Sequence, residues 1–450
     1  MEEPLRTRLL ARSGVIVPAV LELYLSLHRS PELSGFERGT AARFADAIAA
    51  AGLDVTRGVG GHGVVGVLAN GNGPTVMVRC DLDALPVEER TGLAYASRVR
   101  ARGADGIEVP VMHACGHDVH TAAVAGAAQL LAEFREQWSG TLVVVGQPAE
   151  ETLTGARAML ADGLYSRFPR PDVVLAQHVA PFQAGVVAHG TGPMTAASMS
   201  VEAVVHGRGG HSAAPHAAIN PIEIVSAVVS RIAALRSPGD DPHQQSAVTV
   251  GALHAGNRAN VIPDEARLSI SLRGFSDSRL TEALTAVRDI LHTESAAAGC
   301  PRPPTLTVTS EAACNVNDPY FATVVRDTHT SVFGAERIVA WRPLPAAEDF
   351  PLYGAAGVGL HGGPPVPTVY WMVGSVGRRQ WARTPGTTVA DKLAALPVNH
   401  SPEYAPEPVP TLRTAVTAMA AGALGCFTDE AWQKTTVTAT AGRRGAEEYR

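Results

Sequence analysis

Four polar clusters in the sequence carry side chains that can bind metal ions and transfer protons. They lie at residues 79–83, 113–118, 147–151 and 177–178, and together they supply Cys, His, Asp and Glu side chains. Three of them directly follow runs that predict β-strands, and the cluster at 113–118 opens a stretch that predicts a helix. Because open α/β sheets bind ligands beyond the carboxyl ends of their strands, we expect the four clusters to meet at one edge of a sheet.

The residue types in these clusters favour a transition-metal site. Cys115 and His117 are two residues apart on a turn that contains Gly116, so both side chains can face one ion. A thiolate, imidazoles and carboxylates favour zinc, manganese, cobalt or nickel over magnesium or calcium.

The adjacent pair Glu150 and Glu151 adds a candidate for proton transfer. In an extended segment neighbouring side chains point in opposite directions, so one carboxylate can bind metal while the other reaches a metal-activated water. Such a water has a pKa lowered towards about 7, and a nearby carboxylate can take its proton. A pair of glutamates is otherwise typical of a solvated loop, but this pair follows a predicted strand and Pro148. A Cys nucleophile is an alternative, although it would not need two glutamates.

Composition limits the classes of function. The chain has 450 residues, 46% of them apolar, which is enough for two domains or for one domain with an insert. Its formal net charge of -6 does not favour nucleic acid or an anionic membrane as a partner. The cysteines are odd in number, five, and scattered, which favours a reducing compartment, so we expect a cytoplasmic protein.

Neither end of the chain predicts a membrane segment. The apolar run Val15–Leu27 contains Pro18 and Glu22 and lacks a small-residue cleavage site behind it, so we interpret it as an amphipathic first helix rather than a signal peptide. We expect no transmembrane helix elsewhere. Residues 431–450 are polar and aperiodic, and we expect a flexible tail there.

The order of the predicted elements indicates two domains. Residues 1–190 alternate strand-like and helix-like segments, which predicts an α/β catalytic domain with a largely parallel sheet. Residues 191–310 follow the order βαββαβ, typical of a small two-layer ferredoxin-like domain. The larger domain resumes over residues 311–430, so the small domain is predicted to be an insert.

Six motifs occur in order along the chain and carry a family resemblance. They are Asp81-Leu82-Asp83-Ala84-Leu85-Pro86, His113-Ala114-Cys115-Gly116-His117-Asp118, Pro148-Ala149-Glu150-Glu151, Gly210-His211-Ser212-Ala213-Ala214-Pro215-His216, Asn260-Val261-Ile262-Pro263 and Asn399-His400-Ser401-Pro402-Glu403. With these motifs, residues 20–425 resemble the amidohydrolase branch of the aminoacylase/carboxypeptidase-G metallopeptidase family. That branch includes hippurate hydrolases, indole-acetyl-amino-acid hydrolases and N-acyl-amino-acid amidohydrolases. The resemblance implies a mixed-sheet, phosphorylase/hydrolase-like catalytic domain and an inserted lid or dimerisation domain.

The resemblance also implies roles for individual residues. The ligands of a two-metal centre (Zn, Mn, Co or Ni) match Cys115, His117, Glu151, His178 and His400, with Cys115 as the bridge. Glu150 matches the general base, and Asp83 matches a carboxylate that orients a ligand. His113, His120 and His216 match family positions without a firm role, and we interpret them as structural.

Three residues of the predicted insert are implied in substrate binding. His211 matches a residue that polarises the scissile carbonyl, in relatives across a dimer, although His211 can also cap a local turn. Asn260 and Arg273 match positions that hold the substrate carboxylate or its oxyanion, although Arg273 can also be a surface strand residue. The family's usual Ser-Glu-Asp-Phe is Ala347-Glu348-Asp349-Phe350 here.

The function implied is a metal-dependent amidohydrolase that cleaves N-acyl amino acids to a carboxylic acid and a free amino acid, acting as a homodimer through the insert. Alternatives are a di-metal dipeptidase or carboxypeptidase, and a catalytically dead binding protein of the same fold. The aromatic residues of the region around 342–387 hint at an aromatic or long apolar acyl group. They are Trp341, Tyr370, Trp371 and Trp381.

Overall fold

The computed structural model describes residues 1, 3–235 and 246–432. By internal contacts the chain divides into two compact units. The larger unit comprises Met1–Gly192, Val316–Arg342 and the described part of Asp349–Arg450, and the smaller unit comprises Pro193–Asn315 and Pro343–Glu348. The tail expected at residues 431–450 lies outside the described residues from 433 onward.

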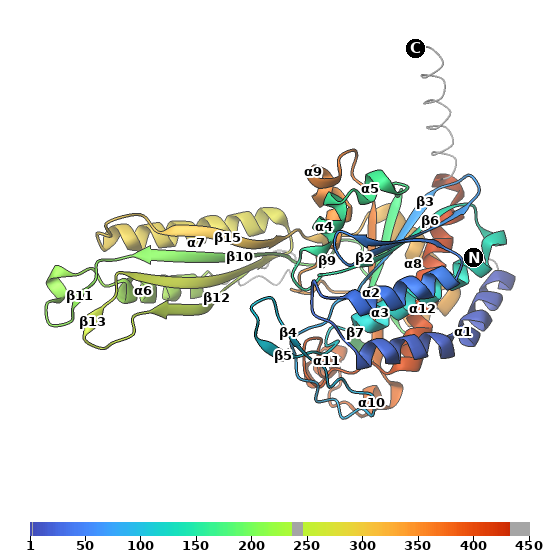
Figure 1. The fold of residues 1–450 in the computed structure, drawn as a ribbon, viewed down its shortest axis with the longest axis horizontal. Coiled ribbons are helices and arrows are strands. Elements are labelled where there is room, and N and C mark those ends of the chain that lie inside the picture. The colour runs from blue at the N-terminus through green and yellow to red at the C-terminus, as the bar shows by residue number, and fades with distance from the viewer. Residues whose placement is uncertain (2, 236–245, 433–450) are drawn as a thin grey trace, which may run out of the picture. The chain divides into compact units, whose positions relative to one another are not determined.

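An eight-stranded mixed sheet forms the centre of the larger unit (Figure 1). Its order is β1 (Asp54–Val59), β2 (Gly63–Asn70), β6 (Gly140–Gln147), β3 (Thr75–Asp81), β7 (Val173–Gln183), β18 (Thr368–Val376), β8 (Val187–His189) and β17 (Ile338–Ala340). The pairs β3–β6, β3–β7, β7–β18 and β8–β17 are parallel, whereas β1–β2, β2–β6 and β8–β18 are antiparallel. The mixed α/β fold class is therefore confirmed. So is the shared edge, because the three strands that precede polar clusters are the parallel neighbours β6, β3 and β7.

The helices of the larger unit pack on this sheet and on one another. They are α1 (Glu3–Arg29), α2 (Arg38–Ala50), α3 (His117–Glu133), α4 (Gly155–Ala161), α5 (Leu164–Arg167), α8 (Pro319–Phe333), α9 (Val358–His361), α10 (Arg378–Arg383), α11 (Val389–Ala395) and α12 (Pro408–Phe427). The small residues of α3 allow α1 and α12 to approach closely. A Cβ at Gly126 would lie 2.8 Å from a methyl group of Val20 and 3.0 Å from one of Val416. This packing holds α3, whose first residue is His117, rigidly against the sheet.

Among the described helices, α1 is the one that is long and apolar enough to cross a membrane, judged by length and composition alone. Its buried positions recur every three or four residues, and Leu9, Ile16, Val20 and Tyr24 belong to the hydrophobic core of the larger unit. One face of α1 is therefore packed inside this unit, as an amphipathic core helix would be.

Strand β18 is buried along its whole length, which changes the interpretation of two aromatic residues. Tyr370 and Trp371 are 1% and 0% exposed, and the indole N–H of Trp371 donates to Gln177 Oε1 at 3.1 Å. They are core residues, so they no longer count as evidence for an apolar acyl pocket.

Two buried histidines lie next to Trp371. The ring atoms His189 Nε2 and His329 Nδ1 are 3.0 Å apart, and His329 Nε2 donates to Ala418 O at 2.8 Å. Burial lowers the pKa of His329 to about 4 and that of His189 to about 2, with a further contribution from the other ring to His189. Both rings are therefore neutral in the folded protein at neutral pH.

Because the folded-state pKa of His329 lies below its ordinary value of 6.5, folding stability is complete above pH 6.5 and is lost as pH falls towards 4. We expect His329→Gln, which keeps an N–H donor for Ala418 O, to reduce the steepness of acid unfolding by about one proton, or about 1.4 kcal/mol per pH unit. Denaturant unfolding between pH 4 and 7 measures this. Identical pH dependence of the variant and the parent protein would refute it.

The smaller unit has the predicted βαββαβ order. The strands of its four-stranded sheet and its two α-helices are, in chain order, β10 (Ala197–His206), α6 (Pro221–Ala233), β12 (Ser246–Ala255), β14 (Glu265–Gly274), α7 (Asp277–Ala297) and β15 (Thr305–Ala312). The sheet order is β12-β14-β10-β15, with antiparallel neighbours, and its core joins β10 and β14 to both helices. The helices begin at local caps, since Asn220 accepts from Ile222 N and Ser276 accepts from Arg279 N. The split βαβ pattern is thus observed.

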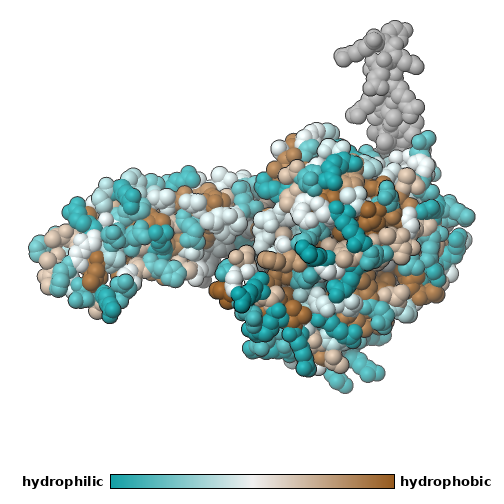
Figure 2. Space-filling model, viewed as in Figure 1, coloured by the Kyte–Doolittle hydropathy of each residue, from teal (hydrophilic) through white to brown (hydrophobic). Residues whose placement is uncertain are grey.

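On the face shown in Figure 2, exposed apolar residues are interspersed with hydrophilic ones on both units. Isolated apolar residues of this kind are normal on a protein surface. Two of the exposed apolar residues of the larger unit, Phe36 and Val398, lie two residues from Ser34 and His400 respectively.

Candidate metal centre

Cys115 lies between two histidines from distant parts of the chain. Its Sγ is 3.3 Å from His178 Nε2, which belongs to β7, and 3.2 Å from His400 Nε2, which belongs to a loop before α12. His400 is anchored by its own N–H, which donates to Ala114 O at 2.8 Å. One sulfur atom therefore faces two imidazole nitrogens at nearly equal distances.

Glu151 and His117 complete the group. Glu151 Oε1 is 3.3 Å from His400 Nε2 and 3.8 Å from His117 Nε2. The five predicted ligands thus meet at one place in the larger unit. His117 is buried, whereas His400 is 54% exposed, so the group has one side open to solvent.

Asp83 holds two members of this group in position. Its Oδ1 lies 3.1 Å from His117 Nδ1, while its Oδ2 accepts from Glu151 N at 2.9 Å and from Ser34 Oγ at 2.6 Å. Burial alone would raise the pKa of Asp83, but the hydrogen bonds and charge of His117, with those from Ser34 and Glu151, lower it below its ordinary value. The ionised carboxylate of Asp83 orients the Nδ1–H of His117. Burial alone would lower the pKa of His117, but the carboxylates of Asp81, Asp83 and Glu151 raise it to about 10, so a cation that binds at Nε2 displaces a proton.

His178 is held in the corresponding tautomer by the backbone. Its Nδ1 donates to Val179 O at 2.7 Å, so the Nε2 lone pair faces Cys115. Burial and the neighbouring His120 keep the pKa of His178 well below its ordinary value. A neutral imidazole with a free Nε2 is the form that binds metal.

The donor atoms of this group fit divalent metal binding. Within the described part of the chain, His117 Nε2 and Glu151 Oε1 are buried and have no hydrogen-bond partner. Burial and the nearby carboxylates Glu151 and Glu150 raise the pKa of the Cys115 thiol well above its ordinary value, so a thiolate there requires positive charge. One sulfur, three imidazole nitrogens and a carboxylate oxygen form a donor set typical of a first-row transition metal.

The segment that carries Glu150 and Glu151 differs from the prediction. We expected an extended segment with opposed side chains, but residues 150–153 form a turn, with Leu153 N donating to Glu150 O at 2.7 Å. Both carboxylates consequently approach His117 Nε2, Glu150 Oε2 at 3.9 Å and Glu151 Oε1 at 3.8 Å. The reason is the left-handed backbone of Ala149, with φ of 50°, which turns the chain at the end of β6.

Left-handed non-glycine residues cluster around this group. In the described residues they are Ala149, Leu153 and His400, the last with φ of 72°. Such conformations cost about 1–3 kcal/mol each and persist where the surroundings impose them. For His400 the constraint includes Asn399, whose side-chain amide donates to Cys115 O at 3.1 Å and to Val179 O at 3.2 Å.

Two residues that we interpreted as structural or left without a role also border the group. His120 lies three residues after His117 on α3, its Nδ1 is 2.6 Å from Asp81 Oδ1, and its Nε2 accepts from Val179 N at 2.9 Å. Asp81 also pairs with the buried Arg79 at 2.7 Å. Two sequence signals could have indicated His120 and Asp81. His120 is three residues after His117, so the two share a helix face, and Asp81 belongs to the polar cluster at 79–83.

The smaller unit places His211 beside Asn260. His211 lies in β11 (Gly210–His211), which pairs with β13 (Val261–Ile262), and Ser212 N donates to Asn260 O at 3.2 Å. His211 Nδ1 accepts from Ala213 N at 3.0 Å, so the ring does cap a local turn, and its side chain is exposed.

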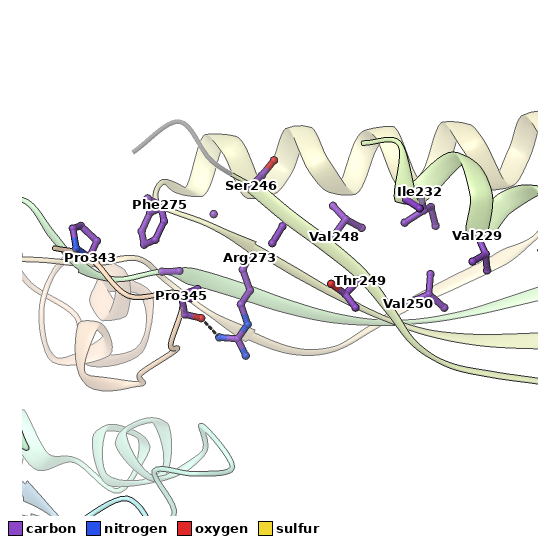
Figure 3. A pocket seen from close by; sticks show the side chains of 14 residues that line it. Val229, Ile232, Ser246, Val248, Thr249, Val250, Arg273, Phe275, Pro343 and Pro345 are labelled. Atoms are coloured by element: carbon purple, nitrogen blue, oxygen red, sulfur yellow. Dashed lines mark hydrogen bonds between the residues drawn. The ribbon is translucent and has the colours of Figure 1, made fainter. Parts of the chain in front are cut away.

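Arg273 lies at the other end of β14. It is eight residues beyond Glu265, about 27 Å at ~3.4 Å per residue. The structure therefore does not bring Arg273 together with His211 and Asn260 within one smaller unit. Its guanidinium donates to Pro345 O beside a cavity of about 630 Å³ that Val248 and Phe275 help to line (Figure 3).

Comparisons with known proteins agree on one family. Residues 77–393 match the sequence profile of peptidase family M20/M25/M40. The chain is 34% identical to thermostable carboxypeptidase 2 of Saccharolobus solfataricus, over 60% of this chain and 67% of the relative. It is 31% identical to the IAA-amino acid hydrolase ILR1-like 2 of Arabidopsis thaliana, over 77% of each chain. It is 37% identical to the hippurate hydrolase of Campylobacter jejuni, over 59% of this chain and 70% of the relative.

Two solved structures share the fold of this chain over more than nine tenths of its length. A putative aminohydrolase from methicillin-resistant Staphylococcus aureus has a TM-score of 0.78 at 27% identity, covering 94% of this chain and 100% of that one. The Bacillus subtilis YXEP protein, described as a dinuclear metal-binding peptidase, has a TM-score of 0.71 at 23% identity, covering 92% and 99%. The second likeness bears on the fold alone.

Proposed function

The chain belongs to peptidase family M20/M25/M40, a family of hydrolases, and from this premise we propose that it uses two divalent metal ions to cleave N-acyl amino acids. The products would be a carboxylic acid and a free amino acid. The observation that carries the proposal is the position of Cys115 Sγ between His178 and His400, with Glu150 and Glu151 beside it. Relatives named hippurate hydrolase, IAA-amino acid hydrolase and N-acetyl-L-cysteine deacetylase support the substrate class.

We assign the metals to the five converging side chains. Cys115 would bridge the two ions, and the other ligands would be His117, Glu151, His178 and His400. The ions would be zinc, manganese, cobalt or nickel. The chemistry that two divalent ions supply in such a site is a water of lowered pKa and a polarised carbonyl.

Glu150 would carry the proton in the reaction. It takes a proton from the attacking water and delivers it to the leaving amine. Asp83 keeps His117 in one tautomer and fixes the amide of Glu151, so it positions ligands without touching the substrate.

The smaller unit would complete the site of a second copy. His211 would stabilise the oxyanion and Asn260 and Arg273 would hold the substrate, but His211 and Arg273 lie at opposite ends of their unit. This separation supports a homodimer in which His211 and Asn260 serve the partner's centre. Five free cysteines suit a reducing compartment and support a cytoplasmic location.

Subunit complementation tests the homodimer. We expect His211→Ala and Cys115→Ala each to be inactive alone, while co-expression restores about a quarter of parental activity per chain. The reason is that half of randomly paired dimers are mixed, each with one complete site. Steady-state rates on the co-purified mixture measure this. Elution of the parent protein as a monomer, or no recovery in the mixture, would contradict the homodimer.

A substrate panel tests the proposed function itself. Metal-loaded enzyme should hydrolyse members of an N-acetyl, N-benzoyl, N-lauroyl and indole-acetyl amino acid series faster than dipeptides. The exposed Phe36 and Val398, close in sequence to Ser34 and His400, favour an apolar acyl group. Chelation should abolish turnover, and Mn²⁺, Zn²⁺ or Co²⁺ should restore it.

The same panel separates the alternatives. Faster cleavage of dipeptides or carboxyl-terminal residues would favour a peptidase, which the relative named thermostable carboxypeptidase 2 makes the second candidate. Turnover that is insensitive to chelators would favour a Cys nucleophile. No turnover on any substrate despite bound metal would favour a binding protein.

A further inference from the structure

The turn that carries Glu150 needs an external constraint. Its residues Ala149 and Leu153 have φ of 50° and 57°, a region that side-chain-bearing residues rarely adopt. Internal hydrogen bonds from Thr154 N and Gly155 N reach Ala149 O, so they fasten the end of the turn. The N–H groups of residues 149 and 151 are not used by these internal hydrogen bonds, and their acceptors lie outside the turn.

Two buried carboxylates accept from these two N–H groups. Glu37 Oε1 accepts from Ala149 N at 2.8 Å and from Gly35 N at 2.7 Å. Asp83 Oδ2 accepts from Glu151 N at 2.9 Å. The backbone is therefore held on both sides of Glu150, once by Asp83 and once by Glu37.

Apart from accepting from Gly35 N within its own loop, the Glu37 carboxylate does not stabilise its local segment as a helix cap. Glu37 is the N-cap residue of α2, where an acidic side chain ordinarily accepts from the first helical N–H groups, but its carboxylate makes no such bond. The Glu32 carboxylate caps α2 instead, because it accepts from Gly39 N at 3.0 Å and from Thr40 N at 2.7 Å. The Glu37 side chain is fully buried, and burial raises its pKa to about 7 against the two amide donors.

We propose that Glu37 is a positioning residue for Glu150: it holds Ala149 in the left-handed conformation that aims the Glu150 carboxylate at the metal centre. This inference rests on the proposed role of Glu150 as the base. It places a requirement on the length of the side chain at position 37, because the acceptor oxygen must reach Ala149 N. The charge of that side chain matters less, since one oxygen accepts both hydrogen bonds.

Length and charge can be varied separately. Glu37→Gln keeps the length and one acceptor oxygen, whereas Glu37→Asp keeps the charge and withdraws the oxygen by one methylene. We expect kcat of Glu37→Asp to fall by at least about tenfold, since small misplacements of a catalytic group are costly. Glu37→Gln should stay within about threefold of the parent, and KM and two metals per chain should be retained in both variants.

The same truncation at Glu32 is the matched control. Glu32 lies in the same segment and its carboxylate caps α2, so Glu32→Asp should lower the melting temperature and leave kcat unchanged. A spectrum of the Co²⁺-loaded protein checks the metal centre independently of activity and should be the same for Glu37→Asp and the parent. The inference is overturned if Glu37→Asp matches or exceeds Glu37→Gln in kcat, or if Glu32→Asp loses kcat equally.

Glu150→Gln separates this inference from the proposed function. If that variant is inactive while Glu37→Asp has normal kcat, only the role of Glu37 is wrong. If Glu150→Gln itself has normal kcat, the role of Glu150 is wrong, and the inference about Glu37 falls with it.

Discussion

Glu150→Gln is expected to keep both metals and to lose about 10²–10⁴-fold in kcat, the range that a general acid–base contributes. Gln has the same shape but cannot take the proton of the attacking water. Glu150 Oε2 lies 3.9 Å from His117 Nε2, close to the ligands, yet Asp83 and Glu37 hold the turn through its backbone. The turn should therefore survive the substitution. Steady-state kinetics and elemental analysis measure the two quantities.

Glu151→Gln is the informative neighbour for this experiment. Glu151 Oε1 lies 3.3 Å from His400 Nε2, so it belongs to the proposed ligand set. Its substitution should reduce metal content, whereas that of Glu150 should not. Near-normal turnover of Glu150→Gln, or loss of metal from it, would refute the assignment of the two glutamates.

The sequence predicts the position of the centre better than its local geometry. The parallel neighbours β6, β3 and β7 follow from β-branched runs, and the polar residues after them share an edge because parallel strands end on the same side. Resemblance to a family adds the distant His400, which no local pattern ties to Cys115. These predictions depend on which residues follow each strand and on the motifs themselves, and both can be identified directly in the sequence.

The turn at residues 149–153 could not be predicted in the same way. Left-handed residues are usually Gly or Asn, and Ala149 and Leu153 give no such signal. The N–H of Ala149 donates to Glu37, which is 112 residues away in the chain and resembles an ordinary N-cap acid. Tertiary hydrogen bonds override local preference here, as is common at functional sites. The distance between His211 and Arg273 likewise depends on the observed length of β14, Glu265–Gly274, which separates the two residues.

The second large effect is expected at Cys115. Cys115→Ala should lose at least one metal per chain, because its Sγ is the atom placed between His178 Nε2 and His400 Nε2. If Cys115 holds both ions as proposed, its loss would remove one ligand from each, so activity should fall with occupancy. Elemental analysis after dialysis against a defined Zn²⁺ or Mn²⁺ buffer measures this, and full occupancy would argue against the bridge.

The melting temperature, measured with and without metal, tests the role of Cys115 independently of activity. Without metal, the Cys115 thiol is buried beside Glu150 and Glu151, and its raised pKa means that it contributes no favourable charge. Metal-free Cys115→Ala should therefore lose only the packing of one buried sulfur atom relative to the metal-free parent. Saturating metal should raise the melting temperature of the parent far more than that of the variant, since ligand binding stabilises by mass action. Cys80→Ala is the matched control: Cys80 is also buried, its Sγ lies 3.7 Å from Val145 O, and it is outside the ligand group. That variant should lose stability with and without metal and keep both ions, so a shared metal loss would mean that Cys115 acts through packing rather than coordination.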